Sequence, residues 1–446
     1  MLTDKSASSP LRIAVAGLGT VGAGVIRLLD TNRDLIAARA GRAIEVVAVS
    51  ARDRSKDRGI DITPYAWDDD MGALAARDDV DVVVELVGGS EGPALACSRA
   101  ALAAGKGLVT ANKAMIAHHG LELAEHAEAH NVPLKFEAAV AGGIPVVKGL
   151  REGTSANALT RIYGILNGTC NYILTEMEAT GADFAETLAE AQKLGYAEAD
   201  PTFDIEGVDA AHKLAILAAI GFGARVDFDA VRTTGIVQVR AADIAQADAL
   251  GFVIRLIAQT DVEESADGPR LLQRVRPCLV AKDHPLAHVD GPTNAVVAEG
   301  NFSGRLLFQG AGAGDGPTAS AVVADLIDIA RGETGERAPQ APFSMPVAQL
   351  AALPPAEPGH RTERAYLRFT VRDRPGVLAE ITAAMRDADV SIESLIQPGR
   401  AREGGEVLVA MVTHEGPEGN VSKAVELLEG SESLTSAPFV LPILPN

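Results

Sequence analysis

The stretch that decides the fold is LRIAVAGLGTVGAGVIRLL, residues 11–29. It begins as an apolar run typical of a buried strand and ends in a pattern typical of a helix, with a glycine-rich turn between them. Strand, tight turn and helix in this order predict the first unit of an α/β sheet.

Three glycines in this turn, Gly17, Gly19 and Gly22, match the pattern G-x-G-x-x-G. The first allows the tight turn, the second lets the backbone approach a pyrophosphate, and the third lets the helix pack on the strand. The start of the helix stabilises the phosphate charge. The turn therefore predicts a dinucleotide site, and a purely structural glycine turn is the alternative. The predicted contacts are the three glycines with Leu18, Thr20 and Val21.

The second strand, EVVAVSARDR at 45–54, bears on which dinucleotide binds. An NAD site usually ends this strand with an acid that holds the ribose hydroxyls. Here the strand ends at Ser50, and Arg52, Arg54 and Lys56 follow. A hydroxyl and cations suit a 2′-phosphate, so NADP(H) is favoured, with Ser50 and Arg52 as contacts, and NAD(H) stays possible. A solvated basic loop is the other interpretation.

Two further β-branched runs, DVVVELVGG at 81–89 and GKGLVTANK at 105–113, end in glycines or polar residues. Strands that alternate with helices indicate a parallel sheet covered on both faces. We predict that Thr110 contacts the cofactor. We also predict that Lys113 lies at the nicotinamide end of the sheet, the alternative being an ordinary loop lysine.

The pattern of predicted helices and strands changes after this first unit. Helical patterns at 181–194, 207–223 and 241–259 mix with strands such as RIYGIL and LLQRVRPCLV, which predicts an α+β unit. The last part reads as a compact βαββα unit, preceded by a stretch rich in Pro, Ala and Glu. The predicted division is 1–147 for a Rossmann-type nucleotide-binding domain, 148–308 for the α+β domain, 309–340 for a segment returning to the first domain, 341–362 for a linker and 363–446 for the βαββα unit.

Composition limits the function classes. The 446 residues carry a formal net charge of −20, which argues against nucleic acid and an anionic membrane surface as partners, because both attract clustered Lys and Arg. The three cysteines are too scattered for a disulfide framework or a zinc site. We find no secretion signal and no apolar run of membrane length, and therefore expect a cytoplasmic protein.

An acid-rich segment, ADPTFDIEGVDAAHKLAIL at 199–217, opens a helix that continues as an apolar run. Asp209 and Lys213 are four residues apart and therefore share one helix face. A surface ion pair is the ordinary explanation and contributes little, but the apolar flanks argue against it. Acids that face lysines suit a substrate with an ammonium group, and Asp204 is predicted to bind it.

Hydride transfer between an alcohol and a nicotinamide needs a group that handles the hydroxyl proton and stabilises charge on the carbonyl oxygen. An ammonium group does both. A second cation nearby lowers its pKa toward neutrality, and a carboxylate holds it in place. For these roles we predict three catalytic residues, Lys213, Lys113 and Asp209.

These motifs resemble the homoserine dehydrogenase family over nearly the whole chain. The resemblance implies reversible NAD(P)-dependent reduction of L-aspartate 4-semialdehyde to L-homoserine, in threonine, methionine and isoleucine biosynthesis. It also implies a homodimer or homotetramer, whose second domain binds substrate and supplies a dimer interface. The motifs that carry it are GLGTVG, TANK at 110–113, FEAAVAGGIP at 136–145, NGTCNYIL at 167–174, LGYAEADPTFDIEGVDAAHK at 194–213 and GAGAG at 310–314.

The resemblance also assigns residues. It makes Lys213 the proton donor in aldehyde reduction, Asp209 its partner carboxylate and Glu198 a substrate-binding residue at the amino group. It places Lys113 between cofactor and substrate. Further implied contacts are Gly195 and Gly314 for the cofactor, and Thr169 and Tyr196 for the substrate.

The family carries a monovalent cation, usually sodium, in the FEAAVAGGIP loop. The resemblance places its ligands at the carboxylate of Glu137 and at the backbone carbonyls of Val140, Gly142 and Ile144. A carboxylate followed by alternate carbonyls is compatible with a hard cation.

The C-terminal unit resembles an ACT domain. RDRPGVLAEI at 372–381 is the strand–turn–helix in which that family often binds an amino acid, and Asp373, Arg374 and Gly376 mark the turn. The implied regulator is L-threonine, although some ACT domains only dimerise.

Other interpretations carry less weight. HAEAH at 126–130 is similar to a zinc-binding helix, but no third ligand is evident, so an exposed helix face is expected. Cys170 has no adjacent His to make it a nucleophile. A 2-hydroxy-acid dehydrogenase would need a catalytic His with a carboxylate. A regulatory nucleotide sensor would not need Lys113, Lys213 and Asp209.

Overall fold

The first layer of the molecule is a parallel sheet. The computed structural model describes residues 9–332, 339–397 and 405–445. Within them, six strands pair in parallel in the order β3-β2-β1-β4-β5-β6, which confirms the predicted Rossmann-type α/β layer. The strands are β1 (Leu11–Ala16), β2 (Ile44–Ser50), β3 (Ala66–Trp67), β4 (Val82–Glu85), β5 (Gly107–Thr110) and β6 (Leu134–Lys135).

Helices cover both faces of this sheet, because successive side chains of a strand point to opposite sides. Ile13 and Val15 of β1 belong to one apolar cluster, and Ala14 and Ala16 belong to another. The first cluster includes α1 (Thr20–Thr31), α2 (Arg33–Ala40) and α12 (Asp315–Gly332); the second includes α3 (Met71–Ala76), α4 (Pro93–Ala103) and α5 (Lys113–His130).

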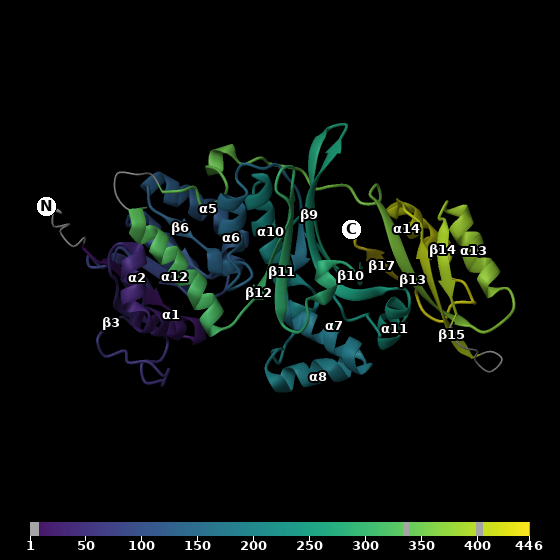
Figure 1. Ribbon diagram of the computed structural model, residues 1–446, viewed down its shortest axis with the longest axis horizontal. Coiled ribbons are helices and arrows are strands. Elements are labelled where there is room, and N and C mark those ends of the chain that lie inside the picture. Colours follow the sequence, from purple (N-terminus) through teal and green to yellow (C-terminus); the bar gives the residue numbers. More distant parts are fainter. Residues whose placement is uncertain (1–8, 333–338, 398–404, 446) are drawn as a thin grey trace.

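Helix α12 reaches this layer from far along the chain, and Figure 1 shows it lying against α1 and α2. A Cβ atom at Gly24 of α1 would lie 3.4 Å from the Cβ of Ala319, so the glycine lets the two helices approach closely. The Arg27 guanidinium binds the carboxylate of Asp315 at 2.9 Å. The chain therefore crosses back after the second domain.

A second, mixed sheet builds the rest of the molecule. Its main path among the described residues is β12-β11-β7-β9-β10-β17-β13-β15-β14. On the catalytic side it contains β7 (Leu159–Ile165), β9 (Phe252–Ser265), β10 (Gly268–Ala281), β11 (Thr293–Gly300) and β12 (Gly304–Ala311), with β8 (Arg232–Thr233) beside β10. The accompanying helices are α6 (Val146–Lys148), α7 (Gly168–Thr180), α8 (Phe184–Leu194), α9 (Thr202–Ile205), α10 (Val208–Phe222) and α11 (Ala241–Ala249).

The predicted helix at 241–259 is wrong in its second half. Helix α11 ends at Ala249, and Gly251 adopts a left-handed φ of +85° before β9 begins. Strand β9 is buried on both faces from Val253 to Asp261, so its apolar run shows no alternation. Such a run cannot be told from a buried helix by periodicity.

The C-terminal unit has the predicted βαββα order and adds two strands, the short β16 and the final β17. It comprises β13 (Thr362–Arg372), α13 (Val377–Asp387), β14 (Ile392–Ile396), β15 (Glu406–Thr413), β16 (Gly416–Pro417), α14 (Glu418–Leu427) and β17 (Phe439–Ile443). Strand β17 pairs with β13 on one side and with β10 on the other. The C-terminal unit and the second domain therefore share one sheet, which the prediction of separate units did not anticipate (Figure 1).

The segment predicted as a linker is partly packed. Phe343 is fully buried and its ring lies 5.5 Å from that of Phe136, while Arg151 donates a hydrogen bond to the carbonyl of Pro342. The Pro-rich segment is thus anchored to residues of both preceding domains. In the part of the chain with described coordinates, no helix has the length and apolar character of a membrane span.

Candidate active site

A cavity of about 1060 Å³ lies where the carboxyl ends of the parallel strands face the second sheet. Open α/β sheets bind ligands at this edge. The lining comes from both domains. It includes Val21, 86–88, 111–113, Ala138, Ala139, Gly142, 167–169, Gly195, Tyr196, Asp204, Asp209, Lys213, 292–294, 309–314 and Thr318.

The glycine turn has the geometry that pyrophosphate binding requires. Gly17 has a φ of +98°, and a Cβ there would lie 2.8 Å from the carbonyl oxygen of Leu86. A Cβ at Gly22 would lie 2.0 Å from the carbonyl oxygen of Gly17. Gly19 faces open space and caps α1, whose first turn has no acid and no side-chain cap. Its backbone N–H groups are therefore available to an anion.

The basic loop after β2 lies at the same end of the sheet. Ser50 is buried, and its carbonyl accepts a hydrogen bond from the Gly17 N–H at 2.8 Å. Arg52 is exposed, whereas Arg54 stacks over the ring of Trp67. Arg58, which the sequence reasoning missed, donates to the carbonyl of Leu18 at 2.9 Å and so braces the glycine turn.

Thr110 does not line the cavity. It is fully buried, and its hydroxyl donates to a Glu85 carboxylate oxygen at 2.6 Å. The other Glu85 oxygen accepts the N–H groups of Val87 and Gly88, which do line the cavity. The contribution of Thr110 to a cofactor site is thus to hold this loop.

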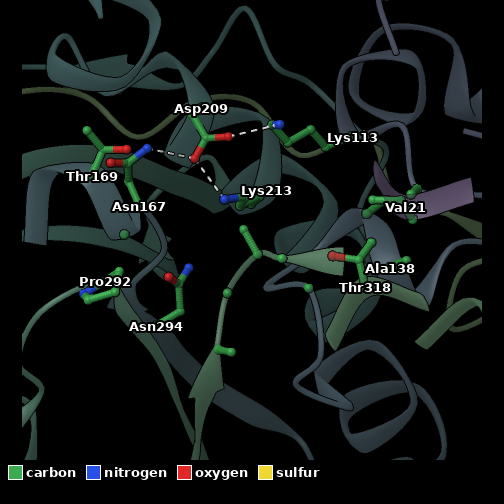
Figure 2. A pocket seen from close by; sticks show the side chains of 18 of the residues that line it. Val21, Lys113, Ala138, Asn167, Thr169, Asp209, Lys213, Pro292, Asn294 and Thr318 are labelled. Carbon is green, nitrogen blue, oxygen red and sulfur yellow. Dashed lines mark hydrogen bonds and ion pairs between the residues drawn. The ribbon is translucent and has the colours of Figure 1, made fainter. Parts of the chain in front are cut away.

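The cavity brings together the three residues predicted to be catalytic (Figure 2). Lys213 donates to Asp209 Oδ2 at 2.7 Å and to the carbonyl of Leu166 at 2.7 Å. Lys113, at the start of α5, lies 3.1 Å from Asp209 Oδ1. Burial alone would raise the pKa of Asp209, but the two ammonium groups hold it far below its ordinary value. Asp209 is therefore an anion shared between two cations.

Asn167 completes this arrangement and was missed as a site residue. Its carbonyl oxygen caps α7 by accepting the N–H of Cys170 at 2.7 Å. Its amide nitrogen donates to Asp209 at 2.8 Å and to Asp204 at 2.7 Å. Asn three residues ahead of Cys170 in NGTC was a helix-cap signal, but its link to the acids is long-range.

Asp204 lines the cavity next to Asn167. Its second carboxylate oxygen lies 3.3 Å from the hydroxyl of Thr169, which also donates to the carbonyl of Tyr196. Burial raises the pKa of Asp204, against the hydrogen bond from Asn167. A cation bound here would favour the ionised carboxylate.

Most of the remaining predicted cofactor and substrate contacts line the cavity, but one does not. Gly195, Tyr196 and Gly314 line the cavity. Glu198 does not: its side chain is exposed, and only its backbone carbonyl is engaged, by Gln192. Helix α9 therefore presents Asp204 to the cavity, whereas the loop before it leaves the Glu198 side chain outside the cavity lining.

The predicted cation loop is closely packed around Glu137. Both Glu137 carboxylate oxygens accept backbone N–H groups, from Val147 at 2.9 Å and Lys148 at 2.8 Å. Burial, with nearby Asp325, raises the pKa of Glu137 to about 7. The carbonyl of Ile144 accepts the N–H of Val146. Two of the predicted sodium ligands, the Glu137 carboxylate and the Ile144 carbonyl, therefore already accept hydrogen bonds from the protein. The other two, Val140 and Gly142, would contribute only their backbone carbonyls. The geometry of the loop therefore adds no support for sodium to the family resemblance.

Neither the HAEAH segment at 126–130 nor Cys170 belongs to this arrangement of lysines and acids. On α5, His130 is exposed and His126 is half-buried, and the described coordinates contain no group of three or more His, Cys, Asp or Glu residues able to hold a metal. Cys170 is buried beside the carbonyl of Asp204, and burial raises its pKa well above the ordinary value. It is a thiol and not a nucleophile.

Three family models match the chain. They are homoserine dehydrogenase over residues 145–327, the homoserine dehydrogenase NAD-binding domain over 17–137 and the ACT domain over 365–430.

Similar proteins agree over nearly the full length. The homoserine dehydrogenase of Pseudomonas aeruginosa is 44% identical over 97% of this chain and 98% of its own length. That of Corynebacterium glutamicum is 44% identical over 95% and 94%. The crystal structure of a homoserine dehydrogenase from Thiobacillus denitrificans superposes with a TM-score of 0.90 at 40% identity, covering 98% of both chains. A hyperthermophilic archaeal homoserine dehydrogenase in complex with NADPH has a TM-score of 0.61 at 26% identity, covering 72% of this chain and 97% of that one.

Proposed function

The chain belongs to the homoserine dehydrogenase family, whose members are NAD(P)-dependent oxidoreductases, and from this premise we propose that Lys213 is the proton donor in the reduction of L-aspartate 4-semialdehyde to L-homoserine. The observation that carries the proposal is the position of its ammonium group. That group has three donors. Asp209 and the carbonyl of Leu166 engage it from the protein side, and the residue lines the cavity.

Lys213 acts on the carbonyl oxygen of the substrate. Its ammonium polarises the aldehyde and transfers a proton to the oxygen as negative charge develops there. When bound, the reduced nicotinamide supplies the hydride. In the reverse direction, the neutral amine of Lys213 accepts the proton of the homoserine hydroxyl.

Asp209 and Lys113 set the conditions for this step. Asp209 fixes the Lys213 side chain from one helical turn away, and both side chains are at least nine-tenths buried. Lys113 adds a second positive charge on the other Asp209 oxygen. Lys213 therefore has an anchoring anion beside it and, across that anion, a second cation.

The assay that tests the reaction is direct. Purified protein with L-homoserine and NADP⁺, then with NAD⁺, should reduce the nicotinamide at mildly alkaline pH. Absence of turnover with both cofactors, in protein shown to bind NADPH, would contradict the proposed activity.

Substrate binding rests on two acids. We propose that Asp204 holds the substrate ammonium group from its place in the cavity, and that Glu198 joins it, as the family resemblance implies, when the loop at 195–201 turns inward. Asp204→Asn is expected to raise the KM for L-homoserine about tenfold or more, because a charge-assisted hydrogen bond is lost. Glu198→Gln should raise it as well, while Glu190→Gln on exposed α8 serves as the control. An unchanged KM in Glu198→Gln would mean that Glu198 stays at the rim in the complex.

Cofactor preference rests on the basic loop. We propose that NADP(H) is preferred because Arg52 is exposed beside the glycine turn and no acid ends β2. Arg52→Ala is expected to raise the KM for NADP⁺ about tenfold and to leave that for NAD⁺ within about twofold. Arg33→Ala, an exposed residue on the neighbouring α2, controls for net charge. Equal effects on both cofactors would contradict a 2′-phosphate contact.

Regulation is proposed for the ACT domain, with L-threonine as the effector. The shared sheet supports it, because Arg274 of β10 binds Glu418 of α14 through two hydrogen bonds of 2.7 and 2.8 Å. Effector binding that shifts α14 would thus reach the catalytic domain. We expect L-threonine to lower turnover and D-threonine to have no effect; equal rates across an L-threonine titration would contradict regulation.

Two further proposals follow from the resemblance alone. The protein is expected to form a homodimer or homotetramer through its second domain, where β12 is an edge strand and Phe302 is 89% exposed. Light scattering measures this. Sodium in the Glu137 loop stays a prediction, and none of the steps above depends on it.

A further inference from the structure

Asn294 is a buried amide without a partner in the wall of the cavity. It is 1% exposed, and its side-chain nitrogen makes no hydrogen bond with any described residue. The neighbouring Asn112 and Asn167, by contrast, both donate to protein oxygens. Among the described lining residues, Asn294 is the one whose buried side-chain nitrogen is left over. Burying a donor without an acceptor costs free energy, so a ligand atom that accepts from it would be favoured.

The strand pairing places this amide near Lys213. Ala295 of β11 pairs with Ile165 of β7, so Asn294 lies beside Leu166, whose carbonyl accepts from Lys213. Val296 and Ala298, which alternate with Asn294 along β11, belong to the same apolar cluster as the residues of α10. Asn294 therefore points to the sheet face that α10 covers.

The chain also leaves room for the amide. A Cβ atom at Gly312 of the adjacent loop would lie 2.1 Å from the side-chain carbon of Asn294, so only glycine fits there. Figure 2 shows Asn294 on the side of the cavity that holds Asn167 and Thr169, away from Val21 and Thr318. This is the substrate side and not the side of the glycine turn.

The charges of the cavity indicate which ligand atom needs this donor. An amino-acid substrate brings an ammonium group and an α-carboxylate. The acids suit the ammonium group, but the two cations in the lining, Lys113 and Lys213, are both engaged by Asp209. A neutral donor for the carboxylate would leave both ammonium groups to Asp209 and to the reacting oxygen, and the free N–H group of Asn294 is such a donor.

Resting on the proposed function, we propose that Asn294 Nδ2 donates a hydrogen bond to the α-carboxylate of the bound amino-acid substrate. The residue determines specificity for substrates that carry this carboxylate, and takes no part in proton transfer.

The test uses Asn294→Asp in the full-length protein. Aspartate keeps the shape, removes the N–H donor and opposes a carboxylate. The KM for L-homoserine should rise about 30-fold or more, as expected for loss of a buried charge-assisted hydrogen bond. Competitive inhibition by 3-amino-1-propanol, which has the hydroxyl and the ammonium group but no carboxylate, should not weaken. The KM for NADP⁺ should stay within about twofold.

Each other outcome overturns the proposal. A rise in the KM for NADP⁺ would assign the amide to the nicotinamide carboxamide. A fall in kcat with an unchanged KM would assign it to the reacting oxygen. Gln309→Glu adds the same charge to the same cavity without removing the buried amide; an equal rise in KM there would assign the effect to charge alone.

Folding is checked by the binding of NADPH, followed by its fluorescence. If Asn294→Asp does not bind NADPH, the smaller and neutral Asn294→Ser replaces it. The KM for L-homoserine should then rise by less than in the aspartate variant, and the inhibition by 3-amino-1-propanol and the KM for NADP⁺ should again stay unchanged. Failure of both variants to fold would make Asn294 a structural residue and overturn the proposal. Turnover of wild-type protein in the same assay separates any of these results from failure of the proposed function.

Discussion

Lys213→Ala is expected to lower kcat for homoserine oxidation by about 10²- to 10⁴-fold, the range for loss of a positioned acid–base group. The wild-type ammonium lies 2.7 Å from Asp209 and lines the cavity, and alanine leaves nothing in its place that transfers a proton. Single-turnover and steady-state reduction of NADP⁺ measure the loss. The affinity for NADPH, whose predicted contacts lie elsewhere, should stay within about threefold.

Two further variants separate proton transfer from charge. Lys213→Arg keeps the cation but does not release a proton near neutral pH, so it should be nearly as impaired as the alanine variant. Lys193→Ala removes an exposed lysine on α8 that pairs with Glu190 and does not line the cavity, and should behave as wild type. Activity in Lys213→Arg close to that of the wild type would show that Lys213 acts only through its charge.

Asp209→Asn is expected to have the second-largest effect, a loss of about 10²-fold in kcat, the size that misplacement of a catalytic group produces. The amide has the shape of the carboxylate but no charge. Lys113 and Lys213 would then face each other across a neutral group, and an amide nitrogen would oppose one of them. The pH–rate profile should move to lower pH, because two cations without their shared anion lose a proton more readily.

The matched control is Asp200→Asn. Asp200 is an exposed acid of the same segment whose carboxylate caps Thr202 at 3.1 Å, and it does not line the cavity. Its variant should keep kcat within about twofold. A pH–rate profile for Asp209→Asn that coincides with that of the wild type would contradict the role of Asp209 as the shared anion, whatever the change in rate.

Several features were predictable because their cause is local. The glycine turn requires a positive φ at Gly17 and backbone space at Gly17 and Gly22, so the motif stands out in any context. Asp209 and Lys213 share a face because a helix brings positions four apart together. Strand runs that alternate with helical ones indicated the parallel sheet. The sequence by itself thus determined the nucleotide-binding fold and the acid–lysine pair.

Other features depend on contacts between distant segments. The amide of Asn167 reaches Asp204 and Asp209, 37 and 42 residues along the chain, only because α7 and α10 meet over the second sheet. Strand β9 is buried on both faces and therefore lost the alternation that marks a strand. The pairing of β17 with β10, which joins the regulatory unit to the catalytic sheet, rests on backbone groups that every residue carries. No side-chain pattern encodes that partnership.

The cavity depends on both the sequence and the tertiary structure. The sequence determined that an acid, a lysine and a glycine turn would be present, because residue type fixes charge and conformational freedom. Only the tertiary structure decided which side chains reach the cavity. It places Lys113 against Asp209, turns Glu198 to the rim and leaves the amide of Asn294 unpaired. Orientation and satisfaction of hydrogen bonds depend on what the rest of the fold places opposite each group, and that is not a property of the residue alone.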